Sequence, residues 1–257
     1  MAIKKREGRR IPTYVIEESE SYPKVSRNNY NEFIKLKKMD FELTNKQKDL
    51  IKMLHSNKII TVTGPPGTSK TFVACYAGIQ MLLDGRVDNI ILSKPTEILS
   101  GTKDLGSLPG DLETKIGVYA ESFMDSFDEF LTQKDLKHLL VDKKVEFKPA
   151  QFLRGRTLKK SFIIIDEYQN FDISSLKSIV TRLGRGSTIC FLGDSKQNDI
   201  NKRYVAVEAF NSIMDGIRGY SNFTFLREDI VREQILIDII DKFEEYENKL
   251  PETIRGN

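Results

Sequence analysis

Short apolar runs alternate with amphipathic stretches along most of this chain. The runs are rich in β-branched residues, which is typical of strands that are buried on both faces of a parallel sheet. They predict strands at residues 59–63, 89–93, 162–165, 188–192 and 223–226, and a short strand within 145–152.

Between these runs, apolar residues recur at helical spacing. This pattern predicts helices at 46–55, 70–83, most of 96–140 with a break at 108–110, 173–183 and the C-terminus. Thr44 is a suitable N-cap for the first helix, and Asp84-Gly85 ends the second. Strands that alternate with helices in this way predict an α/β fold: one doubly wound parallel sheet flanked by helices.

The two ends of the chain differ from this regular part. Residues 1–42 are polar, lack a sustained period and contain Pro12 and Pro23, so they are expected to form an extended arm or tail that wraps a neighbour. Residues 43–250 are expected to form the folded domain, and 251–257 a short tail after Pro251. The helix before this proline has one apolar face, made of Ile235, Ile239, Ile240, Phe243 and Tyr246.

Composition narrows the class of protein. With 39% hydrophobic and 30% charged residues among 257, the chain reads as an ordinary soluble domain. The longest apolar run is 72–77, far short of the ~20 residues that cross a membrane. Two cysteines exclude a disulfide framework, and two histidines argue against zinc chemistry, so a reducing, cytoplasmic compartment is expected.

The net charge of +3 is weak evidence for any partner. Along the sequence, the one local excess of basic residues lies in residues 1–10, which hold five basic residues and one acidic residue, Glu7. This segment is either a solvated terminus or an arm that contacts phosphates.

The strongest chemical signal is the segment 64–71, which lies between a predicted strand and a predicted helix. It matches the phosphate-binding loop G-x-x-x-x-G-K-[ST], except that Ser69 replaces the second glycine. The expected nucleotide-binding residues are Gly64, Pro65, Pro66, Gly67, Thr68, Ser69, Lys70 and Thr71. Backbone N–H groups of such a loop surround the phosphates of ATP. Lys70 is expected to reach the β- and γ-phosphates, and Thr71 to bind Mg²⁺ through its hydroxyl.

The serine is expected to be tolerated. Position 69 begins a helix, where serine is sterically acceptable and supplies the same backbone N–H. The alternative is a glycine-rich turn with no ligand, but the strand, the helix and the Lys70-Thr71 pair all favour a phosphate site.

Two acids end the strand predicted at 162–165. Asp166 and Glu167 match the partner motif of the phosphate-binding loop. Asp166 is expected to hold Mg²⁺ through water, and Glu167 to orient and deprotonate the attacking water as a general base. The alternative is that both acids merely open a helix, whose dipole favours them.

A third motif, residues 193–197, follows the strand predicted at 188–192. Gln197 has both a donor and an acceptor and is expected to contact the γ-phosphate. Alone this signal is weak, because Gly193-Asp194 also suits a turn.

In this order the three motifs resemble the P-loop ATPases of helicase superfamily one. Other segments resemble the PhoH family of phosphate-starvation-associated ATPases more closely, from about Glu42 to Tyr246. They are ILSKP (91–95), LGSLPGD (105–111), RGRTL (154–158), DEYQN (166–170), TRLG (181–184) and Gly193-Asp194 with Gln197 and Asp199.

This resemblance implies a single RecA-like core with ATPase activity, single-stranded RNA or DNA as substrate, and a homo-oligomer such as a hexameric ring. It also implies that Gln47 recognises the adenine edge. The departures from the family pattern are Ser69, Lys94 where arginine is common, and Tyr168 where a small residue is usual. Some relatives carry a nuclease domain, and the region before Leu43 is too short for one, so no nuclease activity is expected.

Hydrolysis builds negative charge on the γ-phosphate, which an arginine commonly stabilises. A single core has no second domain to supply this arginine, so a neighbouring subunit is expected to complete the active site. The candidates are Arg154, Arg156, Arg182 and Arg232. Arg182 and Arg232 are favoured, and the alternative for each is a structural salt bridge.

The sequence therefore predicts Mg²⁺-dependent hydrolysis of ATP, coupled to single-stranded nucleic acid in a helicase-like protein. The alternatives are a nucleotide-gated assembly protein with little turnover, and a small-molecule kinase; Glu167, Gln197 and the lack of an obvious lid segment argue against the kinase. Cys75 and Cys190 are expected to pack in the core. The row Tyr119, Phe123, Phe127 and Phe130 is expected to pack in the core or at a subunit contact rather than stack on bases.

Overall fold

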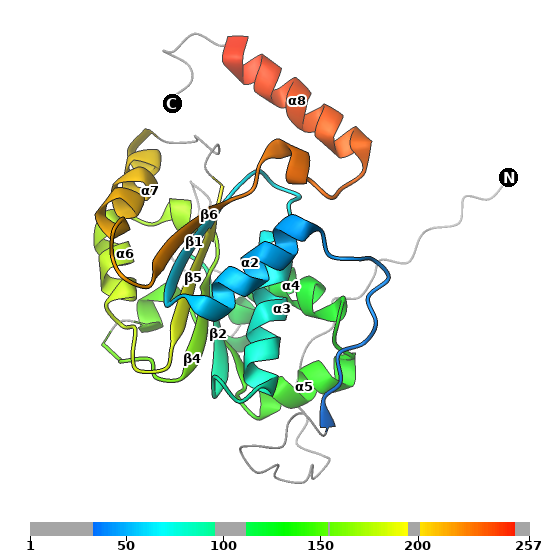
Figure 1. Cartoon of the computed structure of the whole chain (residues 1–257), viewed down its shortest axis with the longest axis vertical. Coiled ribbons are helices and arrows are strands. Elements are labelled where there is room, and N and C mark those ends of the chain that lie inside the picture. The colour runs from blue at the N-terminus through cyan, green and yellow to red at the C-terminus, as the bar shows by residue number, and fades with distance from the viewer. Residues whose placement is uncertain (1–32, 96–111, 154, 195–200, 250–257) are drawn as a thin grey trace, which may run out of the picture.

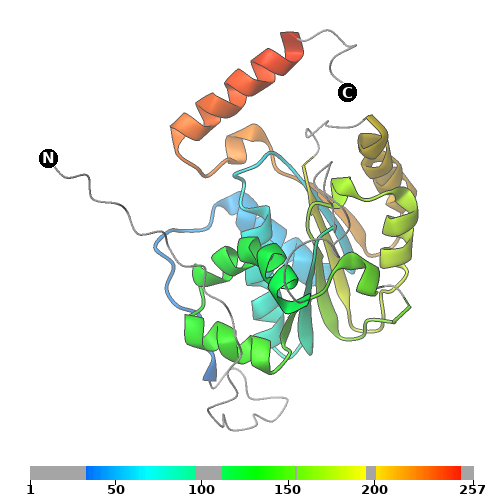
Figure 2. The same ribbon diagram turned by 180° about the vertical axis from the view of Figure 1, so that it is seen from behind.

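Six parallel strands form one sheet with helices on both faces (Figures 1 and 2). The computed structural model describes residues 33–95, 112–153, 155–194 and 201–249. In the sheet order β3-β2-β4-β5-β1-β6, the strands are β1 (Ile59–Thr63), β2 (Asn89–Ser93), β3 (Val145–Phe147), β4 (Ser161–Ile165), β5 (Thr188–Gly193) and β6 (Tyr220–Thr224). The predicted α/β fold with a doubly wound parallel sheet is confirmed.

Seven α-helices and three short 3₁₀ helices lie within the described ranges. The α-helices are α2 (Asn45–Ser56), α3 (Lys70–Leu83), α4 (Leu112–Asp128), α5 (Gln133–Val141), α6 (Ile173–Val180), α7 (Asn201–Met214) and α8 (Gln234–Lys249). The 3₁₀ helices are η2 (Ala150–Leu153), η3 (Tyr168–Asn170) and η4 (Arg227–Asp229). No helix in these ranges has both the length and the apolar character needed to cross a bilayer.

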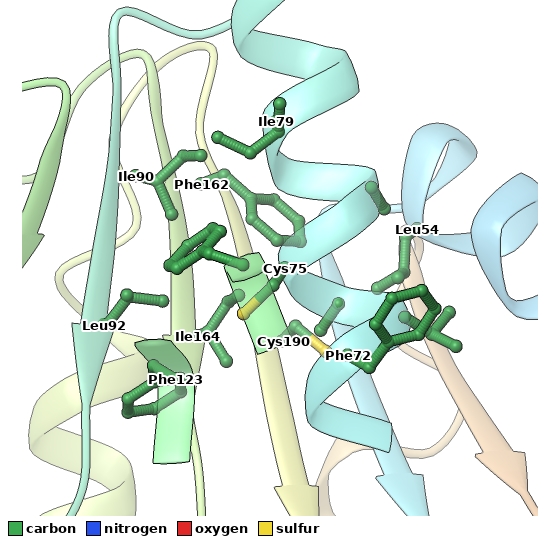
Figure 3. Packing of buried hydrophobic residues seen from close by; sticks show 14 of the residues in the cluster. Leu54, Phe72, Cys75, Ile79, Ile90, Leu92, Phe123, Phe162, Ile164 and Cys190 are labelled. Carbon is green, nitrogen blue, oxygen red and sulfur yellow. The ribbon is translucent and has the colours of Figure 1, made fainter. Parts of the chain in front are cut away.

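The sheet separates two hydrophobic clusters, because successive side chains of a strand point to opposite faces. Phe162 and Ile164 of β4 pack with α2, α3 and α4, whereas Ile163 and Ile165 pack with α6 and α7. Figure 3 shows the first cluster, in which Cys75 and Cys190 are buried as free thiols. The predicted packing role of both cysteines is confirmed.

The aromatic row that runs along α4 and just past its end also belongs to this core. Phe123, Phe127 and Phe130 are at most 1% exposed, and the rings of Phe127 and Phe130 meet edge to face. Core packing is thus confirmed for these three residues, and stacking on bases is not available to them. The side chain of Tyr119 lies outside the description.

Several element boundaries differ from the predicted ones. The last strand was expected at 223–226, but β6 lies at Tyr220–Thr224, where it pairs with β1 from Ile59↔Tyr220 to Thr63↔Thr224. The apolar pattern gives the wrong bounds for this strand because β6 is an edge strand in which only Phe223 is buried. The helix expected at 173–183 ends at Val180, since Leu183 pairs with Leu158.

Three other segments compare with the prediction in different ways. The short strand expected within 145–152 is β3, which ends at Phe147 and is followed by η2. Of the stretch 96–140, residues 96–111 lie outside the description, and a second break separates α4 from α5. The helix α7 carries too weak an apolar period for the sequence to predict it.

The folded body includes residues that the sequence assigned to the N-terminal arm. Ile34 is buried in the first cluster, and the ring of Phe41 meets that of Phe72 edge on at 5.4 Å. The backbone N–H of Lys37 donates to the carbonyl of Phe130 at 3.0 Å. The segment from residue 33 to the start of α2 therefore packs on its own domain, while residues 1–32 of the predicted arm lie outside the description.

Candidate functional site

The phosphate-binding loop lies between β1 and α3, at the carboxyl edge of the sheet. Gly64 and Gly67 have φ values of +153° and +87°, and a Cβ atom on Gly64 would lie 2.6 Å from the Cβ of Phe225. Only glycine fits at Gly64, because Phe225 is held against β1 by its N–H bond to the carbonyl of Thr63.

Lys70 is held inside this loop. Its ammonium group donates to the carbonyls of Gly64 at 2.6 Å and Pro65 at 2.9 Å. Burial lowers the pKa of Lys70, while the nearby carboxylates of Asp194, Asp166 and Glu167 act in the opposite direction. To reach a phosphate, Lys70 has to exchange these two carbonyls for phosphate oxygens.

Ser69 is not in the ordinary helical conformation that the sequence argument assumed. It is the N-cap of α3, with φ +62° and ψ 31° in the left-handed region, and its side chain makes no capping bond. This left-handed conformation costs an L-residue about 1–2 kcal/mol of free energy, whereas glycine adopts it without that cost. The sequence argument called serine sterically acceptable here; the structure adds that Ser69 carries this backbone cost, and α3 begins at Lys70 as predicted.

Thr71 and Asp166 meet across the sheet edge. The hydroxyl of Thr71 donates to Oδ2 of Asp166 at 3.3 Å, and Asp166 is only 5% exposed at the end of β4. A hydroxyl and a carboxylate are hard oxygen donors that suit Mg²⁺, which completes its shell with phosphate oxygens and water. No cluster of three or more His, Cys, Asp or Glu residues occurs in the described ranges, so these two donors are the metal-binding candidates of the site.

Lys94 adds a positive charge that the sequence analysis noted only as a departure from the family pattern. It follows β2, and its Nζ lies 3.4 Å from Oδ2 of Asp166. The same ammonium group donates to Oγ of Ser122 at 2.5 Å and lies 5.0 Å from the ring centre of Phe123. The parallel pairing of β2 with β4, in which Ser93 lies opposite Ile165, brings Lys94 beside Asp166.

Glu167 stands next to Asp166 in a left-handed conformation, with φ +56°. Burial raises the pKa of Glu167, and the negative charge of Asp166 raises it further. The amide nitrogen of Gln169 donates to Oε2 of Glu167, and its carbonyl oxygen accepts from the N–H of Asp194 at 3.2 Å. Gln169 thus connects the candidate base to the end of β5, a role that its position in the motif did not reveal.

The roles predicted for Gln197 and Gln47 stay predictions, like those of the other site residues. Gln197 lies outside the described residues. Gln47 is buried, and its Oε1 accepts the N–H of Thr44 at 3.0 Å, while Oγ1 of Thr44 accepts the N–H of Gln47 at 3.2 Å. This reciprocal pair is a capping box that begins α2, so the expected N-cap is confirmed. Adenine recognition by Gln47 stays a prediction.

The two favoured arginines lie at opposite ends of the sheet. The N–H of Val231 donates to the carbonyl of Gly67 at 3.1 Å, and a Cβ on Gly67 would lie 3.2 Å from Cδ of Arg232. The aliphatic part of Arg232 therefore lies against the phosphate loop of its own chain, whereas the sequence argument placed it in the loop of a neighbour.

Arg182 precedes β5 and belongs to the amino edge. Its carbonyl accepts the N–H of Leu158 at 2.9 Å, and its buried Nε has no hydrogen-bond partner among the described residues. A five-residue strand spans about 17 Å, so Arg182 is too far to reach its own phosphate loop. Arg156 is exposed before β4, and Arg154 lies outside the description.

These features agree with what comparison with known proteins finds. Residues 41–244 match the family model described as PhoH-like protein. This chain belongs to the PhoH-like family. It is 34% identical over 210 residues to a PhoH-like protein of Synechocystis sp., and 29% identical over 221 residues to one of Bacillus subtilis. The matches cover 81% and 86% of this chain but 63% and 67% of those relatives, so the chain spans about two thirds of their length.

The fold is similar to that of a bacteriophage large terminase. The large terminase of a thermophilic bacteriophage, solved in complex with ADP, superposes with a TM-score of 0.50 at 11% identity. The match covers 78% of the PhoH-like chain and half of the terminase chain. At this identity the likeness shows the fold, and it confirms the predicted single RecA-like P-loop core.

Proposed function

We propose that this PhoH-like chain binds ATP with Mg²⁺ and hydrolyses it. The observation that carries the proposal is the 3.3 Å contact of Thr71 with Asp166, because it joins the phosphate loop to the acidic strand end. Glu167 lies beside this contact with a raised pKa, as suits a general base. When bound, Mg²⁺ supplies charge neutralisation on the phosphate oxygens.

Each residue of the site then has a defined task. The N–H groups of the loop and the start of α3 bind the phosphates, and Lys70 moves from its two carbonyls to them. Thr71 and Asp166 hold the metal ion. Glu167 orients a water molecule toward the γ-phosphate and accepts its proton, while Gln169 holds the carboxylate in place.

The active site also needs an arginine opposite the γ-phosphate. We assign this role to Arg182 of a neighbouring subunit, since Arg182 lies too far from its own loop. Arg232 remains a candidate within the chain, since it packs beside Gly67. The homo-oligomer, with a hexameric ring as its expected form, follows from this assignment and from the family resemblance.

We also propose that hydrolysis is coupled to single-stranded RNA or DNA, which rests on the family resemblance. Phosphate release is measured with and without single-stranded RNA and DNA. Stimulation of several-fold supports the coupling, and turnover that ignores both polymers contradicts it.

Two variants test hydrolysis itself. Lys70→Ala is expected to abolish nucleotide binding, and Glu167→Gln to retain binding and stop turnover. Glu146→Gln is the matched control, because Glu146 is a partly buried glutamate of the sheet that pairs with Lys148, away from the phosphate loop. If Glu167→Gln turns ATP over at the control's rate, Glu167 is not the base. If the wild type binds ATP without turnover, the chain is a nucleotide-gated assembly protein.

A further inference from the structure

The helix α8 stands apart from the rest of the domain. In both views it lies beyond the carboxyl edge of the sheet, and Asp241 joins it to η4 through an ion pair with Arg227 (Figures 1 and 2). The segment before it is tied to the phosphate loop by the bond from Val231 to Gly67. In proteins, most of the stability of a helix comes from packing of its apolar face.

One side of α8 is an apolar stripe open to solvent. Ile235, Ile239, Phe243 and Tyr246 recur at helical spacing and are 60%, 46%, 65% and 63% exposed. The helix also has a negative balance, with five acidic residues against two lysines. Its partner should therefore offer exposed apolar side chains in a basic setting.

The opposite end of the molecule offers both exposed apolar side chains and an excess of basic residues. We call it the amino edge, and it comprises the segments that lead into the six strands: 57–58, 84–88, 142–144, 158–160, 181–187 and 215–219. These segments hold nine basic residues against four acidic ones, although the whole chain has a net charge of only +3. Backbone hydrogen bonds join Lys58 to Gly219, and Lys160 to both Asp88 and Arg185. The side chain of Lys144 donates to the carbonyl of Asp88, so neighbouring segments of this edge lie side by side.

Apolar side chains lie at the same edge. Ile213, at the end of α7, and Ile217, in the next turn, are 62% and 46% exposed. Arg218 follows Ile217 directly, and Lys58 bonds to the adjoining Gly219. The amino edge is thus complementary to α8 in both polarity and charge.

We infer that the apolar stripe of α8 docks on the amino edge of a second copy of this chain. The two surfaces lie at opposite ends of the molecule, so the contact is head to tail, and the assembly closes into a ring or continues as a filament. The inference builds on the proposed function, because it brings the amino edge, with Arg182 and Arg185, toward the phosphate loop of the next copy.

The basic edge could instead attract a nucleic acid backbone. Four acidic side chains within it, Asp84, Asp88, Asp142 and Asp215, disfavour a row of phosphates. The exposed isoleucine side chains also make no favourable contact with a charged phosphate backbone. A second copy of the chain fits both features and covers α8 as well.

Mixing two defective variants tests the head-to-tail contact. One variant carries Ile239→Ser and Phe243→Ser in α8, and the other carries Ile217→Ser and Arg218→Glu at the amino edge. The control is Phe152→Ser, which alters a side chain that is 56% exposed but belongs to neither surface. Molar mass is measured by light scattering without nucleotide, and folding by circular dichroism.

The wild type and the control should assemble, and each surface variant alone should have the molar mass of one chain, 29.5 kDa. A mixture of the two variants should form a heterodimer, because one intact α8 and one intact amino edge remain. A mixture that stays monomeric while both variants are folded overturns the inference, as does a monomeric wild type.

A third outcome also overturns it: the amino-edge variant loses single-stranded RNA binding but assembles normally, which assigns the edge to nucleic acid. Assembly is measured without ATP, and Lys70→Ala should assemble as the wild type does. A failure of the proposed hydrolysis therefore leaves this test intact, and a failure of docking does not affect ATP binding.

Discussion

The ammonium group of Lys94 lies 3.4 Å from the carboxylate oxygen of Asp166 that also accepts the hydroxyl of Thr71. One oxygen atom therefore serves a lysine, a threonine and, in the proposed complex, the shell of Mg²⁺. Lys94 therefore already places a positive charge beside Asp166, where the metal ion is proposed to bind.

Replacing Lys94 should alter metal binding to the nucleotide-free protein. Lys94→Met removes the cation that pairs with Asp166, so Mg²⁺ should bind roughly threefold more tightly or better. Lys94→Arg keeps the charge and should bind Mg²⁺ as the wild type does. Calorimetric titration with MgCl₂ measures the affinities, and equal affinities for Lys94→Met and the wild type would show that the ion pair does not compete with the metal.

The left-handed conformation of Ser69 predicts a stabilising substitution. Ser69→Gly should raise the free energy of unfolding by about 0.5–1 kcal/mol, because the relief of the backbone exceeds the entropy that glycine loses. Ser126→Gly, inside α4, is the matched control and should lower the free energy of unfolding by about 0.5 kcal/mol. Urea unfolding measures both, and a change of the same sign in both variants would contradict the assignment.

Tyr168 is a core residue despite its place in the acidic motif. Its side chain is fully buried against Phe191, and Nδ2 of Asn211 donates to its hydroxyl at a long 3.4 Å. Tyr168→Ala should cost about 3–5 kcal/mol of unfolding free energy, and Tyr168→Phe at most about 1 kcal/mol. Urea unfolding checks both values, and a nearly neutral Tyr168→Ala would exclude the packing role.

His55 should make stability depend on pH. Burial lowers its pKa, and the positive charge of Arg86, which donates to Nδ1, lowers it further. The unfolded chain then binds the proton more readily than the folded one, so stability is lost as the pH falls through the ordinary value of 6.5. The free energy of unfolding of His55→Gln should fall less than that of the wild type between about pH 7.5 and pH 5.5. Equal losses in the two proteins would show that another group causes the acid sensitivity.

The sequence alone determined the local parts of this protein. The strand at Ile59–Thr63, the helix at Lys70–Leu83 and the loop between them were predicted with the boundaries observed. These features depend on side chains a few positions apart, so their periodicity and capping residues can be recognised in the sequence itself. Where local patterning was weak, the prediction was poorer: the bounds of β6 were shifted, and α7 was not predicted. Pairing with β1 and packing of Phe210 on Phe191 of β5 shape these two elements.

Only the tertiary structure decided which strand ends meet. The order β2-β4-β5-β1 puts Lys94 beside Asp166, and Gln169 between Glu167 and Asp194. The path of the chain after β6 puts Arg232 against its own phosphate loop. Strand order is a choice among many that satisfy the same hydrophobic pattern, so no spacing in the sequence encodes these contacts; they exist because the folded sheet brings its carboxyl ends to one edge.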